Sequence, residues 1–214
     1  MIEIAQRMQK LTPNFFATLT SQIQSMQAAG ADIIRLDQGS PDLPPAPPII
    51  AALDRSAASP DAHTYQPHRG TKKMRAAWAE MYRREYNVEL DPEKEVIPLL
   101  GSKEGIFHMI AAFIDPGDVV LIPDPGYMTY THGTVFAGGE PYYFPLQAER
   151  DYLPDLQEIQ PSVLKKAKLL WLNYPNNPTT ASAPLEFFEE AVSFARKNNL
   201  LLCHDAAYGQ VTFT

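Results

Sequence analysis

The chain has 214 residues, 45% of them hydrophobic, enough for the core of one good-sized domain or slightly more. Its formal net charge of -7 argues against nucleic acid as a partner, because nucleic-acid-binding proteins need a basic surface. The single cysteine excludes an intramolecular disulfide, and the absence of a long apolar run or signal-peptide pattern predicts a soluble, cytoplasmic protein without a membrane partner.

The first half of the chain predicts helices separated by irregular segments. Apolar residues at spacings of three and four predict a helix that stops at Gly30, a residue that readily ends helices. These apolar residues are Phe16, Leu19, Ile23 and Met26. A short strand is expected over residues 31–36. The prolines of residues 38–48 predict an extended loop, for which a plain connector is one explanation, and a short helix is expected over residues 49–58.

A second helix is expected from Gly70-Thr71 to about Tyr86, after an irregular segment at residues 65–70. Large side chains at helical spacing are expected to point inward as core residues rather than to bind a cofactor. They are Met74, Trp78, Met81 and Tyr82.

From Val96 onward, short apolar runs alternate with segments of helical length. Strands are expected over residues 96–100, 119–122, 142–144, 169–172 and 200–204. Helices are expected over residues 106–113, 128–136 and 185–197, with a mixed segment at 153–164. This alternation requires right-handed crossovers, so the sequence predicts an α/β fold with a mostly parallel sheet and helices on both faces.

Polar residues follow successive strands, where open α/β sheets bind ligands. Gly101-Ser102-Lys103 begins a helix, whose free N–H groups attract anions, although Ser102 could simply cap that helix. Tyr127 could stack on a planar ligand or serve in ordinary packing. Asn177 could donate a hydrogen bond to a ligand or form an Asn-Pro turn.

Asp205 ends the last strand, and Tyr208 follows it closely. A carboxylate after an apolar run is costly unless it is paired, and a cationic ligand nitrogen or a helix-capping role would each pair it. Together with the residues above, this set would suit a phosphorylated, flat, nitrogen-containing ligand. No metal site is predicted.

In these motifs the sequence resembles the class I/II aminotransferases, pyridoxal-phosphate enzymes of fold type I, and within them the aspartate and LL-diaminopimelate aminotransferase-like group. The resemblance extends from Leu11-Thr-Pro-Asn-Phe-Phe16 to Tyr208, and its most specific parts are Asn173-Tyr-Pro-Asn-Asn-Pro-Thr179, Asp205-Ala-Ala-Tyr208 and Gly101-Ser-Lys-Glu-Gly105. It implies an N-terminal arm and small-domain segment at residues 1–58 and a partial cofactor-binding large domain at residues 59–214.

The resemblance also implies roles for individual residues. Ser102 and Lys103 would hold the phosphate of pyridoxal 5'-phosphate, and Tyr65 would reach the phosphate in the neighbouring subunit of a homodimer. Tyr127 would stack on the ring. Asn177 and Tyr208 would hydrogen-bond the ring's phenolic oxygen, and Asp205 would pair with the pyridinium nitrogen. Gly39 would contact the substrate carboxylate, and Phe15 would border the substrate pocket.

The sequence departs from the family pattern in three respects. Phe15 stands where the diaminopimelate enzymes tend to carry Tyr, which weakens the case for that substrate, and Thr180 stands where many relatives carry Gly. In the family, the lysine that forms the Schiff base lies beyond the Asp-x-x-Tyr strand, and none of the nine lysines here matches it. The arginine that binds the substrate carboxylate in relatives is also missing. We therefore expect a portion of a longer enzyme, with a sheet incomplete at its C-terminus and no activity alone.

The expected reaction is the transfer of an amino group from an amino acid to a 2-oxo acid. The alternatives are a β-lyase, an aminocyclopropane-carboxylate-synthase-like enzyme, a non-catalytic binding subunit that keeps the cofactor pocket, and a complete small α/β protein with another sheet order.

Overall fold

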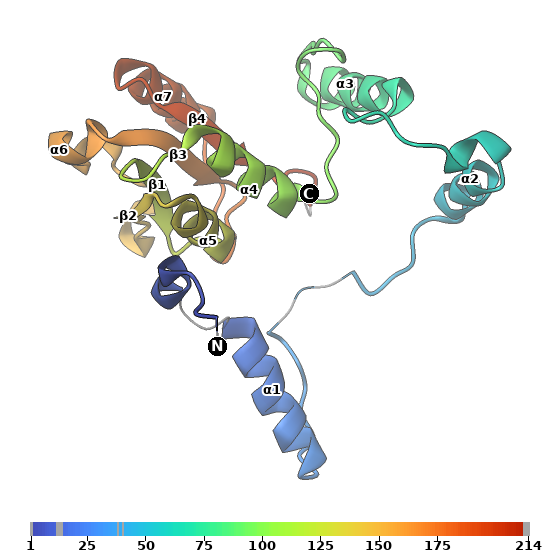
Figure 1. Cartoon of the computed structure of the whole chain (residues 1–214), viewed down its shortest axis with the longest axis horizontal. Coiled ribbons are helices and arrows are strands. Elements are labelled where there is room, and N and C mark those ends of the chain that lie inside the picture. The colour runs from blue at the N-terminus through green and yellow to red at the C-terminus, as the bar shows by residue number, and fades with distance from the viewer. Residues whose placement is uncertain (1, 12–14, 38, 40, 212–214) are drawn as a thin grey trace. The chain divides into compact units, whose positions relative to one another are not determined.

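The structure, a computed structural model, describes residues 2–11, 15–37, 39 and 41–211 (Figure 1). The chain divides into two compact units, one made of Met1–Thr12 with Leu99–Thr214 and the other of Pro13–Pro98. Each unit is described by itself. The expected domain boundary between residues 58 and 59 stays a prediction.

The unit that begins at Leu99 is built on a four-stranded sheet with the order β2-β1-β3-β4, in which every neighbouring pair is parallel. The strands are β1 (Val119–Asp124), β2 (Glu140–Pro145), β3 (Ala167–Asn173) and β4 (Leu201–Asp205). The expected parallel α/β sheet is therefore confirmed. Its register pairs Asn173 with Asp205, so the last residues of β3 and β4 are neighbours.

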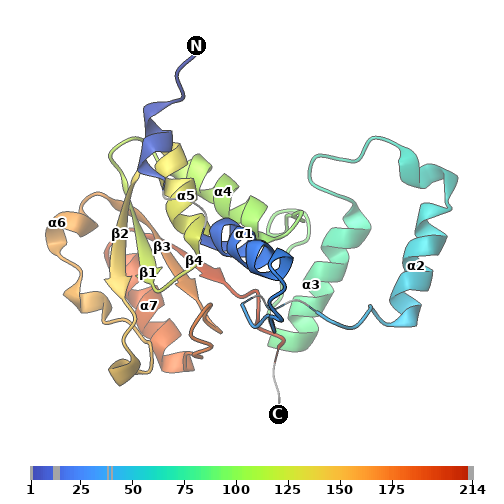
Figure 2. The same ribbon diagram turned by 90° about the horizontal axis from the view of Figure 1, so that it is seen from below.

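Helices cover both faces of this sheet (Figure 2). One face packs against α4 (Ser102–Phe113) and α5 (Met128–Ala137), and the other packs against α6 (Pro161–Leu164) and α7 (Leu185–Lys197). Strand residues alternate between the two cores because side chains along a strand point to opposite faces. Val120, Ile122, Leu169 and Trp171 face α4 and α5, whereas Val119, Leu121, Leu170 and Leu172 face α7.

Short 3-10 helices complete this unit at Gln6–Lys10 (η1), Ala148–Arg150 (η3) and Leu156–Glu158 (η4). The N-terminal segment is attached to α5, because Arg7 Nη1 donates a hydrogen bond of 3.0 Å to the carbonyl oxygen of Phe136. The mixed segment at residues 153–164 thus contains η4 and α6.

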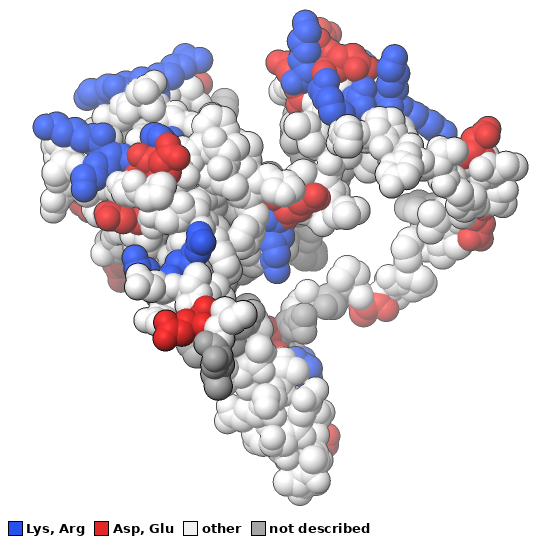
Figure 3. Space-filling view, viewed as in Figure 1, with Lys and Arg blue, Asp and Glu red and all other residues white. Residues whose placement is uncertain are grey.

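The other unit is helical and contains α1 (Phe15–Ala28), α2 (Pro47–Ala57), η2 (Pro60–His63) and α3 (Lys72–Tyr86). The expected helices are confirmed, and α1 is followed by Gly30 in the left-handed conformation, with a φ of 89°. The hydroxyl of Thr71 caps α3 by accepting a 3.2 Å hydrogen bond from the N–H of Met74. On the face seen in Figure 3, α3 carries charges of both signs, whereas α1 contains no charged residue.

Two expected strands are absent from the structure. Residues 31–36 and 96–100 form no strand, although both are rich in apolar residues. A strand needs a neighbour for its N–H and C=O groups, and neither segment forms a ladder with any other part of the described chain. As a result Leu100 is 95% exposed. Local composition predicted these strands, but pairing decides whether they form.

Two expectations about helices also need correction. The loop expected to run to residue 48 ends earlier, because Pro47 and Pro48 begin α2. Proline is tolerated there, since the first-turn N–H that it lacks has no helical partner anyway. The expectation that the large side chains of α3 form a core is wrong, because Trp78, for example, is 45% exposed. A single helix cannot bury an apolar face without a second layer.

The residue that α3 does bury is Arg75. Its guanidinium donates to the carbonyl oxygens of Pro92 (2.8 Å), Arg69 (3.1 Å) and Gly70 (2.7 Å) and pairs with the carboxylate of Glu93 at 2.8 Å. These bonds satisfy a buried charge and tie the irregular segment at residues 65–70 to the turn around residue 92.

Across the described part of the chain, every helix is too short or too polar to cross a bilayer.

Candidate functional site at the carboxyl ends of the strands

The parallel strands place the end of β1, β3 and β4 along one edge of the sheet. Asp124 ends β1 shortly before Tyr127, Asn173 ends β3 and Asp205 ends β4. Within this unit, the residues predicted to bind a ligand follow these ends or lie at the start of α4. The topology therefore positions them along one edge, as expected for an open α/β sheet.

Among the residues that the structure describes, no side chain caps the N-terminus of α4. Gly101 is the N-cap residue, with φ 86° and ψ 156°, a backbone conformation that is open to glycine and strained for other residues. Ser102 is already the first residue of the helix, so the alternative that it caps α4 is wrong. Glu104 accepts a hydrogen bond from the N–H of Leu100 at 2.6 Å, one residue before the cap. The first N–H groups of the helix stay available to an anion.

Lys103 lies beside the candidate aromatic residue. Its ammonium nitrogen is 5.8 Å from the centre of the Tyr127 ring, within the range of a cation–π contact. Tyr127 is the N-cap residue of α5 and is half-buried. The structure thus brings together a cation that could hold a phosphate and a ring that could stack on a flat ligand.

Hydrogen bonds connect Asp205 to the loop that carries Asn177. The side-chain nitrogen of Asn173 donates to the carbonyl oxygen of Asp205 at 2.8 Å, while its side-chain oxygen accepts from the N–H of Asn177 at 2.7 Å. The N–H of Ala207 donates to Asp205 Oδ1 at 3.3 Å. Asn173 therefore connects the end of β4 to the loop at Asn177 through its side-chain amide. Sequence reasoning missed this role.

Tyr130 is a second residue that sequence reasoning missed. Its phenol is fully buried and donates a 2.8 Å hydrogen bond to Asp205 Oδ2. Its ring stacks on Trp171 with centroids 5.0 Å apart and meets the edge of Tyr127 at 5.9 Å. Burial, and then the charge of Asp205, raise the pKa of Tyr130, so the phenol keeps its proton and acts as a donor. Its spacing of three from Tyr127 was the available sequence signal.

The remaining predicted residues differ in what the structure shows of them. The amide side chain of Asn177 and the hydroxyls of Ser102 and Tyr208 make no hydrogen bond to another described residue. They are free to bind a ligand. Tyr65, Gly39 and Phe15 belong to the other unit, and the neighbours of Gly39 at positions 38 and 40 lie outside the described residues. The roles expected for these residues stay predictions.

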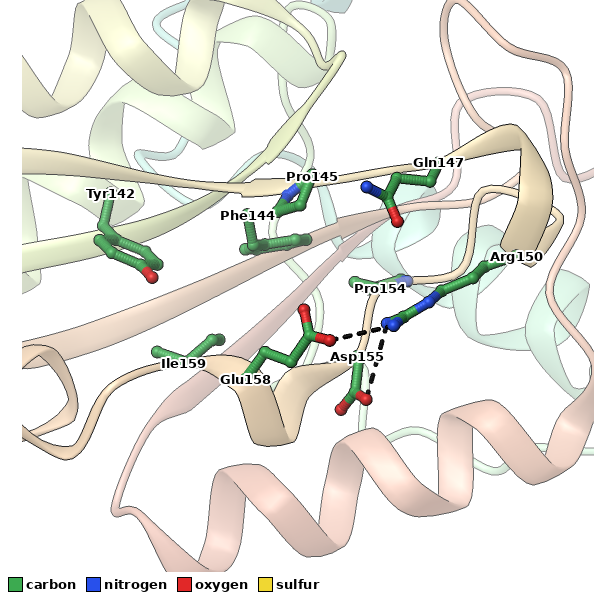
Figure 4. Close-up of a pocket in the computed structure, with 9 residues that line it drawn as sticks. All are labelled: Tyr142, Phe144, Pro145, Gln147, Arg150, Pro154, Asp155, Glu158 and Ile159. Atoms are coloured by element: carbon green, nitrogen blue, oxygen red, sulfur yellow. Dashed lines mark hydrogen bonds and ion pairs between the residues drawn. The ribbon is translucent and has the colours of Figure 1, made fainter.

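A separate cavity of about 110 Å³ lies at the β2 edge of the sheet (Figure 4). Arg150 lines this cavity and forms ion pairs with Glu158 at 3.0 Å and with Asp155 at 3.6 Å. The rest of the lining is the amide side chain of Gln147 and a set of aromatic and aliphatic side chains, namely Tyr142, Phe144, Pro145, Pro154 and Ile159. Because β2 and β4 are opposite edges of the sheet, this cavity is distinct from the site at Asp205.

The chemistry of the sheet-edge site fits one type of ligand. An uncapped helix N-terminus with Lys103 suits a phosphate, Tyr127 suits a flat ring, and the Asp205 carboxylate suits a protonated nitrogen. Asp205 keeps acceptor capacity, because a carboxylate accepts about four hydrogen bonds and the described residues donate only two to it.

Comparison with known proteins identifies the family. Residues 31–214 match the family described as aminotransferase class I and II. The chain belongs to this family. It is 47% identical to the LL-diaminopimelate aminotransferase of Moorella thermoacetica, over 98% of this chain and 54% of the relative, and 44% identical to the LL-diaminopimelate aminotransferase of Aquifex aeolicus, over 99% and 54%.

Solved structures of other proteins share the fold. A substrate-bound BacF structure from Bacillus subtilis matches with a TM-score of 0.91 and 42% identity, covering 96% of this chain and 52% of that one. An aspartate aminotransferase variant from Thermus thermophilus matches with a TM-score of 0.88 and 28% identity, covering 96% and 53%. This aminotransferase-family chain thus spans about half the length of the curated relatives it matches.

The thiol of Cys203 provides a test of packing next to the site. Cys203 pairs in register with Trp171, and burial raises the pKa of its thiol to about 11. Only the thiolate reacts with iodoacetamide, so near pH 8 alkylation of the folded chain should be about 100-fold slower than in urea. The rate should rise as pH increases towards 11. Mass spectrometry over time gives both rates, and equal rates in the two states would contradict the burial of this thiol.

Proposed function

We propose that this chain forms the cofactor-binding part of a pyridoxal 5'-phosphate-dependent aminotransferase, which transfers an amino group from an amino acid to a 2-oxo acid. The observation that carries this proposal is the arrangement at the sheet edge, where Lys103 lies beside Tyr127 and Tyr127 is linked through Tyr130 to Asp205. Membership of the aminotransferase family supports it.

The residues of the site divide the work of holding the cofactor. Ser102, Lys103 and the free N–H groups of α4 would hold its phosphate, since a helix N-terminus and an ammonium group both favour anions. Tyr127 would stack on the ring, and Asn177 and Tyr208 would hydrogen-bond its phenolic oxygen. The bound cofactor supplies an electron sink for the carbanion formed on the substrate.

Asp205 is the residue that would tune the ring. A negative carboxylate facing the ring nitrogen favours the protonated form of that nitrogen, because an opposite charge stabilises the cation. The bonds from Tyr130 and Ala207 restrict the orientation of the carboxylate and leave lone pairs for the nitrogen. Asp205 would therefore hold a proton on the ring nitrogen throughout the reaction.

The helical unit would complete the site in a homodimer. Tyr65 would reach the phosphate in the neighbouring subunit, Gly39 would offer its backbone N–H to the substrate carboxylate, and Phe15 would border the substrate. The relatives named above are LL-diaminopimelate aminotransferases, so a diamino dicarboxylic acid is the first donor to assay. Phe15 weakens the case for that donor, because the diaminopimelate enzymes tend to carry Tyr at this position. Aspartate and glutamate should therefore be tested in the same assay.

Cofactor binding tests the proposal on the chain as it exists. Quenching of tryptophan fluorescence should show saturable binding of pyridoxal 5'-phosphate, with inorganic phosphate as a competitor. Lys103→Met should weaken binding about 10-fold or more, as expected for the loss of a hydrogen bond to a charged group. Lys165→Met, which removes an exposed lysine on the other face of the sheet, is the matched control. The proposal is wrong if the unmodified chain shows no saturable binding.

The reaction class needs a separate measurement. Consumption of an amino acid that depends on a 2-oxo acid supports amino transfer, whereas pyruvate and ammonia formed from a cysteine-like substrate without a 2-oxo acid would favour a β-lyase. We expect no turnover by the 214 residues alone. Borohydride trapping should accordingly leave no stable adduct on any single one of their nine lysines.

A further inference from the structure

The buried phenol of Tyr130 occupies a position that the proposed cofactor roles leave unexplained. Tyr130 lies on α5, is 0% exposed, and reaches across the sheet edge to donate to Asp205 Oδ2 at 2.8 Å. We propose that Tyr130 is a positioning residue that orients the Asp205 carboxylate towards the ring nitrogen of the cofactor. This inference rests on the proposed function, because it assigns Tyr130 a role through Asp205.

Ring contacts hold the Tyr130 phenol in one place. Trp171 stacks against one side of the ring, with an angle of 13° between the planes, and Tyr127 meets it edge-on at 87°. A side chain clamped in this way loses little further entropy when its hydroxyl makes a bond. The hydroxyl therefore presents a fixed donor to Asp205 rather than adapting to it.

The two bonds to Asp205 come from different segments of the chain. Oδ2 accepts from Tyr130 on α5, whereas Oδ1 accepts from the N–H of Ala207, just after β4. Together they oppose rotation of the carboxylate about its terminal bond, which is otherwise soft. The carboxylate is thereby held in one orientation, with lone pairs left for the ring nitrogen.

Tyr174 gives a matched comparison within the same unit. It is also a buried tyrosine, and its hydroxyl donates a 2.7 Å hydrogen bond, but the acceptor is the backbone carbonyl of Tyr152. Tyr174→Phe therefore removes a buried phenol bond of similar geometry that does not involve Asp205. Any effect specific to Tyr130→Phe reflects the carboxylate rather than the loss of a buried hydroxyl.

A double-mutant cycle in the absence of cofactor tests the link itself. Urea unfolding of the Tyr130→Phe, Asp205→Ala and double variants should show coupling of about tenfold in the unfolding equilibrium constant, because the two groups are in direct contact. The cycle of Tyr174→Phe with Asp205→Ala should give a coupling factor near one, which means that the two effects on the unfolding equilibrium are independent. Coupling near one for Tyr130 with Asp205 would overturn the proposal.

Cofactor selectivity tests the role towards the ring nitrogen. Fluorescence titration of Tyr130→Phe should show about tenfold weaker binding of pyridoxal 5'-phosphate, but unchanged binding of the analogue that carries carbon in place of the ring nitrogen. Tyr174→Phe should bind both as the unmodified chain does. Equal weakening for the two ligands would overturn the positioning role and leave the proposed function standing. If the unmodified chain binds neither ligand, both proposals fail.

Discussion

Asp205→Asn should weaken the binding of pyridoxal 5'-phosphate by about 10- to 100-fold, because a neutral amide cannot pair with a protonated ring nitrogen. The substitution keeps the size of the side chain, and the amide oxygen can still accept the hydrogen bond that Tyr130 donates to Asp205 Oδ2. The loss therefore isolates the charge. Equilibrium dialysis or fluorescence titration measures it directly.

Asp155→Asn is the control for this substitution. Asp155 is a half-exposed carboxylate beside the cavity at β2, paired with Arg150 at 3.6 Å and remote from the site at Asp205. Its replacement should leave cofactor affinity unchanged, since surface ion pairs contribute little. A similar loss in both variants would indicate a general charge effect, and an unchanged affinity for Asp205→Asn would refute the pairing with the ring nitrogen.

Leu170→Ala should lower the free energy of unfolding by about 3–5 kcal/mol, the range for emptying a fully buried leucine site. Leu170 is 0% exposed in β3, a central strand of the sheet, and belongs to the core between the sheet and α7. Both neighbouring strands are hydrogen-bonded, which limits how far the surroundings can collapse into the cavity. Urea unfolding followed by circular dichroism provides the measurement.

Leu201→Ala is the control for Leu170→Ala, because it makes the same substitution at a less buried leucine. Leu201 lies on the edge strand β4 and is 37% exposed, so its truncation should cost about 1 kcal/mol or less. The slope of unfolding against urea should stay the same in both variants. A cost below about 1 kcal/mol for Leu170→Ala would show that this core is not packed as the structure describes.

The elements that the sequence predicted correctly are those whose pattern is local. Alternating short apolar runs and helical segments predicted β1 to β4 and α7. The central strands β1 and β3 are buried on both faces, and such strands read as continuous apolar runs. The polar residues after these runs also predict a ligand site at one sheet edge, and that site stays a proposal. Parallel strands necessarily bring their carboxyl ends to the same side.

Predictions that depended on a partner elsewhere in the chain were less successful. Residues 31–36 and 96–100 have strand-like composition but pair with no strand among the residues described. Trp78 has helical core spacing but is 45% exposed. Composition and periodicity describe what a segment can bury, whereas a neighbouring layer determines whether it is buried.

The sequence by itself determined that this protein has a parallel α/β sheet, with Tyr127, Asn177 and Asp205 after its strands and Ser102 and Lys103 at the start of a helix. Each of those inferences needs only residues within one local motif. Only the tertiary structure decided how the site is held together, through Asn173 and through the hydrogen bond from Tyr130 to Asp205, which spans 75 residues. Local patterns carry no information about that contact, because chain topology and packing bring its two groups together.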